Sequence, residues 1–170
     1  MKRRVRTNLI LLAVVVLLGV AVYAELRREE AMADPLTSLD IDAVRTLSVS
    51  CIGCRPRRFE KDGAHWRMLE PYAQPADDRA IARLLDIARA PVRLRHARGE
   101  LDAKKIGLDP PQATLQLDGM LLKFGKNDAI DGDRYADVDG VVALVPDRFS
   151  VLLFAAPENE LAKPPPAAKD

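Results

Sequence analysis

The chain has 170 residues, and its 26 lysine and arginine residues nearly balance 25 aspartate and glutamate residues, for a formal net charge of +1. No basic patch is interleaved with aromatic residues, which argues against a nucleic-acid partner. With 48% hydrophobic residues, the chain is long enough to bury one substantial core.

The N-terminus combines a basic cluster with an apolar run. Residues 1–6 hold four cations, and residues 7–25 carry no charge until Glu25. As a helix, the uncharged run would extend about 27 Å, close to the thickness of a bilayer's hydrocarbon core. Because the basic cluster should stay in the cytoplasm, we predict a single-pass anchor in the bacterial inner membrane, with the rest of the chain in the periplasm. A signal peptide cleaved after Ala24 is the alternative, and it exports the same residues.

Polar stretches bound the exported part on both sides. Residues 26–38 are typical of a linker. Residues 157–170 are rich in proline, alanine and charge, which predicts a disordered tail. Residues 39–156 are therefore expected to form one periplasmic domain.

The first predicted strand ends in the C-x-x-C motif of Cys51 and Cys54. Leu47, Val49 and Cys51 alternate along it, and we expect it to pair with the strand of Phe59. Exported thiols tend to pair, and a tight turn between these two would make them cross-strand neighbours near disulfide reach. Three alternatives stay open: a redox-active pair, which needs its first sulfur at a helix N-terminus; half of a zinc site, for which the chain offers only two histidines; and a pair of free thiols.

Three Asp-Gly pairs, each flanked by strand-like residues, predict three β-hairpins. Each pair also predicts which residues face one another. The pairs and the expected partners are Asp62-Gly63 with Phe59 opposite Trp66, Asp118-Gly119 with Leu115 opposite Leu122, and Asp139-Gly140 with Tyr135 opposite Leu144.

Three helices are predicted between and after the hairpins. Asp77 is a suitable N-cap for a helix that Pro91 ends, and its apolar stripe consists of Ile81, Leu84, Leu85 and Ala88. Residues 101–108 predict a short second helix, and residues 146–156 a third. The element order predicts an α+β fold, with a largely antiparallel sheet built from Asp-Gly hairpins, helices packed on one face, and one preceding transmembrane helix.

A cationic segment follows the first of these helices. Arg93, Arg95, His96 and Arg98 lie close together in it and form a candidate interaction patch for anionic headgroups or an acidic partner. A solvated strand edge explains the same residues, because arginines on an edge block unwanted pairing.

Other polar clusters predict structure more strongly than chemistry. Asp77 and Asp78 are typical of a helix N-terminus, and residues 127–133 of a polar turn rather than a calcium loop. His65 is expected to face Glu60 across the first hairpin. We therefore expect no catalytic residue, no metal and no cofactor.

The order of several short motifs resembles the bacterial family called domain of unknown function 4340. The motifs are the D-G-x-W hairpin of Asp62, Gly63 and Trp66 followed by Pro71, the Ala-Asp before an apolar helix, the G-L-D-P-P of residues 107–111, and the strand ending in Phe124 and Gly125. The resemblance covers most of residues 39–154 and the N-terminal span. It implies a membrane-anchored exported domain without assigned catalytic residues, encoded in some members beside transporter permeases and ATPases. The C-x-x-C pair is not a mark of the family.

Together these features predict a non-enzymatic periplasmic accessory or interaction protein held in the inner membrane. Its partner would be another envelope protein, such as the subunits of an ABC-type transporter. The first alternative is a periplasmic thiol-disulfide protein that uses Cys51 and Cys54, and the second is a periplasmic ligand-binding domain, which requires a concave pocket.

Overall fold

The computed structural model describes residues 8, 11–24 and 34–163, which belong to two compact units divided after Asp34. In the first unit, residues 11–24 are helical and expose large apolar side chains. Among the described residues, no helix is both long and apolar enough to cross a bilayer. Residues 7, 9, 10 and 25 of the expected span lie outside the described residues, so the transmembrane helix stays a prediction.

The second unit is an α+β domain with one nine-stranded antiparallel sheet. Its strand order is β4-β3-β2-β1-β6-β7-β8-β9-β5. The strands are β1 (Thr46–Cys51), β2 (Arg57–Asp62), β3 (His65–Glu70), β4 (Gln74–Pro75), β5 (Leu94–His96), β6 (Ala113–Leu117), β7 (Met120–Asn127), β8 (Arg134–Val138) and β9 (Val141–Val145). The expected α+β class and antiparallel sheet are thereby confirmed.

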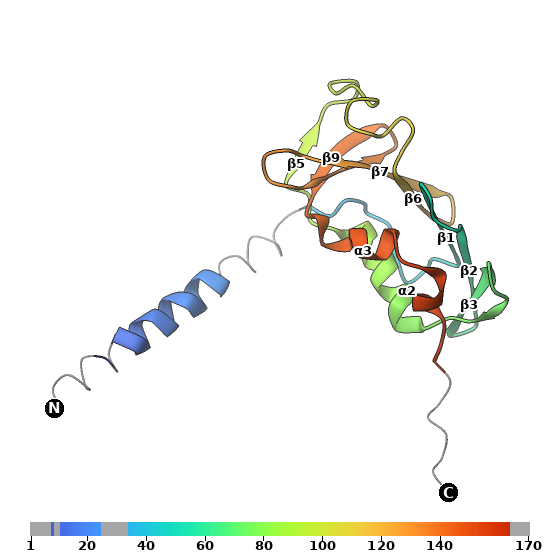
Figure 1. Cartoon of the computed structure of the whole chain (residues 1–170), viewed down its shortest axis with the longest axis horizontal. Helices are drawn as coiled ribbons and strands as arrows, with labels where there is room; N and C mark the ends of the chain where they lie inside the picture. The colour runs from blue at the N-terminus through green and yellow to red at the C-terminus, as the bar shows by residue number, and fades with distance from the viewer. Residues whose placement is uncertain (1–7, 9–10, 25–33, 164–170) are drawn as a thin grey trace, which may run out of the picture. The chain divides into compact units, whose positions relative to one another are not determined.

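Short helices form a second layer against this sheet. They are α2 (Asp78–Leu85), η1 (Asp86–Arg89), η2 (Asp147–Phe149), α3 (Ser150–Leu153) and η3 (Pro157–Glu160). Figure 1 shows α2 and α3 side by side beneath the curved sheet, and α3 contacts β1 and β6. The core lies between the two layers because strand alternation and helix periodicity direct apolar side chains to the same space.

β1 lies next to the central strand β6 and connects the β2–β3 hairpin with the β6–β7 hairpin. Leu47 faces Phe59 of β2 on one side and Leu117 of β6 on the other. All three side chains are fully buried. The alternation in β1 therefore predicted both the buried face and the pairing with the strand of Phe59.

Two of the three hairpins have the expected register. Leu115 faces Leu122 around the second Asp-Gly pair, and Tyr135 faces Leu144 around the third. Positive φ angles at both aspartates of these turns, 48° at Asp118 and 52° at Asp139, are the conformation that the Asp-Gly signal predicts.

The first hairpin is shifted by one residue from the expected register. Phe59 faces Met68, and Trp66 faces Lys61, because the two-residue loop consists of Gly63 and Ala64. Gly63 takes a positive φ of 61° at the first loop position, a placement typical of type II′ turns. The predicted opposition of Phe59 and Trp66 was wrong, yet both side chains are buried on the same face, as expected.

The first helix begins as its cap predicts. The Asp77 carboxylate accepts a hydrogen bond from the Arg79 amide at 2.9 Å, and the predicted apolar stripe is buried. The α-helix ends at Leu85, and the following turn tightens into the 3-10 helix η1 before Pro91.

The helix expected over residues 101–108 is not formed. The segment makes one turn, closed by hydrogen bonds from the Gly107 amide to the Lys104 carbonyl and from the Leu108 amide to the Ala103 carbonyl. This pair of bonds is the Schellman arrangement that ends helices. Gly107 therefore ends the segment after one turn, before a longer helix can form.

The ordered domain extends beyond residues 39–156 at both ends. Leu36 is buried, and its amide donates to the Ala90 carbonyl at 2.8 Å. At the other end Pro157 is buried in η3, and the Ala162 amide donates to the Pro75 carbonyl at 3.0 Å. The expected tail therefore includes folded residues, whereas residues 164–170 lie outside the described part.

Gly125 of β7 permits a close approach of the 101–108 turn. A Cβ atom added there would lie 2.3 Å from the Ile106 carbonyl oxygen. We expect Gly125→Ala to lower the free energy of unfolding by about 1–3 kcal/mol through this overlap, as measured by urea denaturation. Gly119→Ala is the control, since a Cβ atom there meets nothing within 4 Å. Equal stability of the two variants would contradict the packing argument.

Candidate functional site

The disulfide turn, residues 51–54, joins the end of β1 to the segment before β2. Cys51 and Cys54 form a disulfide with their Cα atoms 5.2 Å apart, and the Cys54 amide donates to the Cys51 carbonyl at 3.2 Å. Gly53 takes a φ of 77° at the third turn position, which is the requirement of a type II turn. Cys54 lies outside β2, so the expected cross-strand arrangement was wrong, whereas the disulfide itself is confirmed.

The position of the disulfide turn favours a structural disulfide. Its first cysteine ends a strand, whereas a redox-active pair has its first sulfur at a helix N-terminus. Ile52 at the tip is 66% exposed, and its amide donates to the Gln112 carbonyl at 2.9 Å, which fixes the turn to the start of β6. The turn closes a short covalent loop that clamps neighbouring backbone segments.

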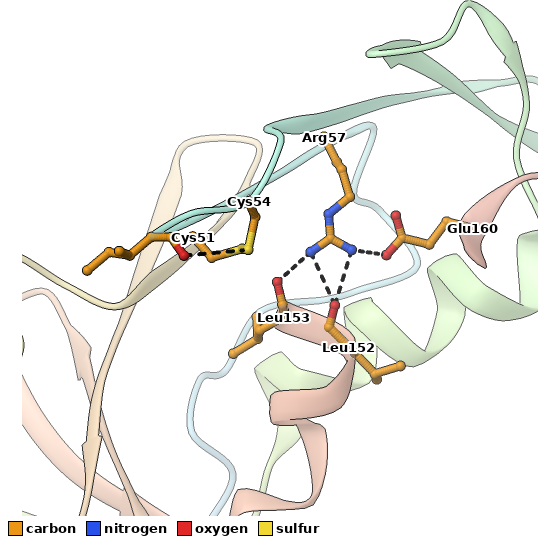
Figure 2. Close-up of a disulfide and its surroundings, with 7 residues drawn as sticks. Cys51, Cys54, Arg57, Leu152, Leu153 and Glu160 are labelled. Carbon is orange, nitrogen blue, oxygen red and sulfur yellow. Dashed lines mark hydrogen bonds and ion pairs between the residues drawn. A yellow bond between two sulfur atoms is a disulfide. The ribbon is translucent and has the colours of Figure 1, made fainter. Parts of the chain in front are cut away.

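The buried guanidinium of Arg57 lies close to this turn (Figure 2). Its side chain is fully buried and pairs with the carboxylate of Glu160 in η3. It also donates to the carbonyl of Leu152 at 3.1 and 3.2 Å and to that of Leu153 at 2.5 Å. β2 thus meets α3 and η3, two neighbouring segments that lie about ninety residues later in the sequence, at one side chain.

Burial changes the pKa of both partners. Desolvation raises the pKa of Glu160 to about 7, against the attraction of Arg57. Desolvation also lowers the pKa of Arg57, although Glu160 counteracts it. One carboxylate oxygen of Glu160 and the Nε atom of Arg57 are buried without a hydrogen-bond partner among the described residues. The Arg57–Glu160 pair therefore joins β2 to η3, but its burial costs a large desolvation free energy.

The sequence contained a signal for this pair that the sequence analysis missed. Arg57 shares the strand alternation of Phe59, so it had to face the core and required a partner there. Glu160 could not be recognised as that partner because it belongs to the segment expected to be disordered.

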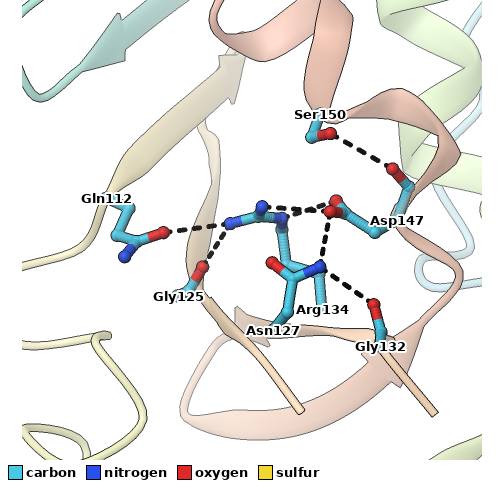
Figure 3. Close-up of polar contacts among 7 residues, drawn as sticks. All are labelled: Gln112, Gly125, Asn127, Gly132, Arg134, Asp147 and Ser150. Atoms are coloured by element: carbon cyan, nitrogen blue, oxygen red, sulfur yellow. Dashed lines mark hydrogen bonds and ion pairs between the residues drawn. The ribbon is translucent and has the colours of Figure 1, made fainter. Parts of the chain in front are cut away.

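A second buried arginine connects β8 with η2 (Figure 3). Arg134 donates to both carboxylate oxygens of Asp147 at 2.6 and 3.1 Å, to Gln112 at 3.1 Å, and to the Gly125 carbonyl. Asn127 donates to the same carboxylate at 2.6 Å. Desolvation acts to raise the pKa of Asp147, but the hydrogen bonds outweigh it and lower the pKa. The network fixes the start of η2, where the chain passes from the sheet into the helical layer.

The cationic segment around β5 binds mainly to its own domain. Arg93 pairs with Asp133 at 3.3 Å, and Arg95 donates to the Pro35 carbonyl at 2.7 Å. The other two residues also have partners in the domain. His96 pairs with Glu100 at 3.2 Å, and Arg98 donates to the Asp139 carbonyl. These contacts secure an edge strand beside β9, and the proposed use of the four residues as an interaction patch stays a prediction.

His65 pairs with Asp78 rather than with Glu60. Its Nδ1 atom lies 2.7 Å from the Asp78 carboxylate, which also accepts from the Trp66 amide at 2.8 Å. The hydrogen bond with His65 is the main cause of the lowered pKa of Asp78. The correction follows from the shifted hairpin register, which places His65 opposite Asp62.

Acidic side chains of the 127–133 loop form a polar turn. Asp128 accepts from the amides of Ile130 and Asp131 at 3.0 and 3.1 Å, while Asp133 pairs with Arg93. Within residues 8, 11–24 and 34–163, no group of three or more histidine, cysteine, aspartate or glutamate side chains could hold a metal ion.

A surface groove, termed here the helical groove, lies between α2–η1 and the η2–α3–η3 segment. It consists of two hollows of about 280 and 450 Å³. Arg83 and Leu152 line both hollows. The smaller hollow also contains Arg89 and Arg148, and the larger one contains apolar side chains of α3 and the residues after it.

Comparison of the chain with protein-family models, with curated proteins and with solved structures finds no match. The resemblance to the family called domain of unknown function 4340 therefore stays a prediction.

The pH dependence of stability tests the environment of Glu160. Because its pKa is higher in the folded chain, the folded state binds the proton more tightly, and this stabilising contribution falls as the pH rises from about 4.5 to about 7. We expect the free energy of unfolding to fall by about 3 kcal/mol more in the wild type than in Glu160→Gln over that range.

Glu158→Gln is the matched control on the same turn. The hydrogen bond from Tyr72 lowers the pKa of Glu158, so its contribution is present above the unfolded pKa and is lost as the pH falls. Chemical denaturation at a series of pH values measures both variants. A wild type and a Glu160→Gln variant with parallel pH profiles would contradict the raised pKa.

Proposed function

We propose that this chain is a non-enzymatic accessory protein anchored in the bacterial inner membrane. Residues 7–25 form the anchor, and the α+β domain lies in the periplasm, where it binds another envelope protein such as a transporter subunit. The Cys51–Cys54 disulfide is the observation that carries the proposal, because disulfides persist in oxidising compartments and are rare in the cytoplasm.

Two further features support this proposal. The helical residues 11–24 expose apolar side chains along their length, and residues 1–6 supply the basic flank that stays on the cytoplasmic side of an anchor. Buried arginines explain much of the domain's polar interior as structural, since Arg57 and Arg134 bind carboxylates and carbonyls of the fold itself. An interaction domain requires such a rigid framework and an available surface.

A periplasmic thiol-disulfide protein is the second candidate. The exposed tip of the disulfide turn favours it, because a partner thiol must reach one of the sulfur atoms. Against it stands the strand end on which Cys51 lies, where no helix N-terminus stabilises a thiolate.

Topology and partnership are tested in the same cells. A reporter active only after export, fused after Asp170, should be active, and the same fusion without residues 1–25 should not be. Crosslinking in intact cells, followed by mass spectrometry of gently solubilised membranes, should join the domain to an envelope protein. A reporter active only in the cytosol contradicts the anchor, and the absence of any crosslinked partner contradicts the accessory function.

The disulfide should stabilise the domain without serving a reaction. For a closed loop of four residues, chain entropy predicts a loss of about 2 kcal/mol in the free energy of unfolding for Cys51→Ser/Cys54→Ser. The wild type under reducing conditions is the control and should lose the same amount. Cells carrying the double variant should retain the phenotype of the wild type, whereas a null phenotype with a folded variant would favour the thiol-disulfide candidate.

A further inference from the structure

The helical groove carries an excess of positive charge on an exposed surface. Arg83, Arg89 and Arg148 line the smaller hollow together with a single acidic residue, Asp86. All four residues are exposed. The carboxylate in the larger hollow belongs to Glu160, whose charge is compensated by Arg57. The surface therefore complements an anion rather than a cation.

Apolar side chains continue this basic surface along the other end of the groove. Val151 is 76% exposed and Phe154 is 39% exposed, whereas their neighbour Leu153 is fully buried in the core. The short helix α3 thus turns one apolar side chain inward and offers another to the solvent. A basic surface that continues into exposed apolar side chains has the composition of segments that lie in the interface of anionic membranes.

We propose that the helical groove docks the domain onto anionic phospholipid headgroups of the bilayer that anchors the chain. Arg83 and Arg89 contact the phosphates, and Val151 and Phe154 enter the interface beside them. This inference rests on the proposed membrane anchor. Charge complementarity selects the lipid, because guanidinium groups pair with phosphate oxygens through paired hydrogen bonds.

The size of the apolar patch favours a lipid surface over a protein partner at this site. Two exposed apolar side chains suffice for shallow insertion, whereas a stable protein interface buries at least about 1,000 Å² around an apolar centre. The tether makes a weak affinity sufficient. Residues 25–34 separate the proposed anchor from the domain in the sequence, and ten residues span at most about 35 Å, so this connection would raise the effective concentration of lipid near the domain.

The test uses the full chain in nanodiscs of phosphatidylcholine alone or of an equimolar mixture with phosphatidylglycerol. With the disulfide kept oxidised, Val151→Cys provides a single free thiol for an environment-sensitive fluorophore. We expect a blue-shifted emission and quenching by lipid-borne quenchers in the anionic nanodiscs only. Leu121→Cys, on the sheet face opposite the helices, is the control label and should stay in water in both lipids.

Removal of charge provides the second comparison. Arg83→Ala/Arg89→Ala should lower the ratio of docked to free domain about thirtyfold, because each cation near an anionic surface contributes about fivefold. Arg58→Ala/Arg67→Ala removes the same charge from exposed positions of the uncovered sheet face and should leave docking unchanged. Raised salt should weaken docking of the wild type.

Each other outcome overturns the inference. A label at position 151 that stays in water, or that is shielded equally in neutral lipid, excludes anionic headgroups as the occupant. Shielding that appears only after an envelope protein is added to the nanodiscs assigns the groove to that protein. A chain that does not remain with the nanodiscs after an alkaline wash overturns the anchor and the docking together, whereas failure of the label alone leaves the anchor intact.

Discussion

The guanidinium of Arg57 is the contact on which the arrangement of the domain depends. Arg57 is the first residue of β2, and its guanidinium binds the last two carbonyls of α3 and the carboxylate of Glu160. A cation buried there without these partners would cost several kcal/mol, so the helical layer must close in one position. Polar pairing therefore decides the position of α3 and η3 on the sheet, together with apolar packing.

The second buried arginine complements the first at the other end of the helical layer. Arg134 orients η2 through Asp147, just as Arg57 orients η3 through Glu160. The two ion pairs differ in electrostatics. Hydrogen bonds keep Asp147 acidic, whereas burial dominates at Glu160 and raises its pKa. Of these two carboxylates, Glu160 therefore has the pKa closer to neutral pH, and it lines the helical groove that we assign to the membrane.

The residues that bear on the cellular location of this chain differ from the polar residues that could have indicated a reaction. Our proposal of export rests on the basic and apolar N-terminus and on the paired cysteines, because features of these kinds depend on the compartment of a protein and not on a reaction. The polar residues that looked reactive in the sequence are instead occupied within the fold. Arg93 and Arg95 hold an edge strand, and Asp128 closes its own loop. The proposed docking therefore uses other residues, on the basic and apolar side of the helical layer.

Local signals in the sequence determined most of the sheet. Two Asp-Gly turns set their registers correctly because positive φ at the aspartate is a property of a few adjacent residues. The cap at Asp77 and the apolar stripe behind it likewise predicted α2. The first hairpin was one residue out of register because the sequence permits either Asp62-Gly63 or Gly63-Ala64 as the loop, and packing decides between them.

Only the tertiary structure decided the contacts between distant segments. The pairing of Arg57 with Glu160 spans most of the domain, and it converts a segment with the composition of a disordered tail into a buried turn. The groove depends on the same event, because η3 forms part of its wall. Composition and periodicity reflect the local conformational preference of a segment. The partner of a buried charge is instead set by which distant residues the folded chain brings close to it.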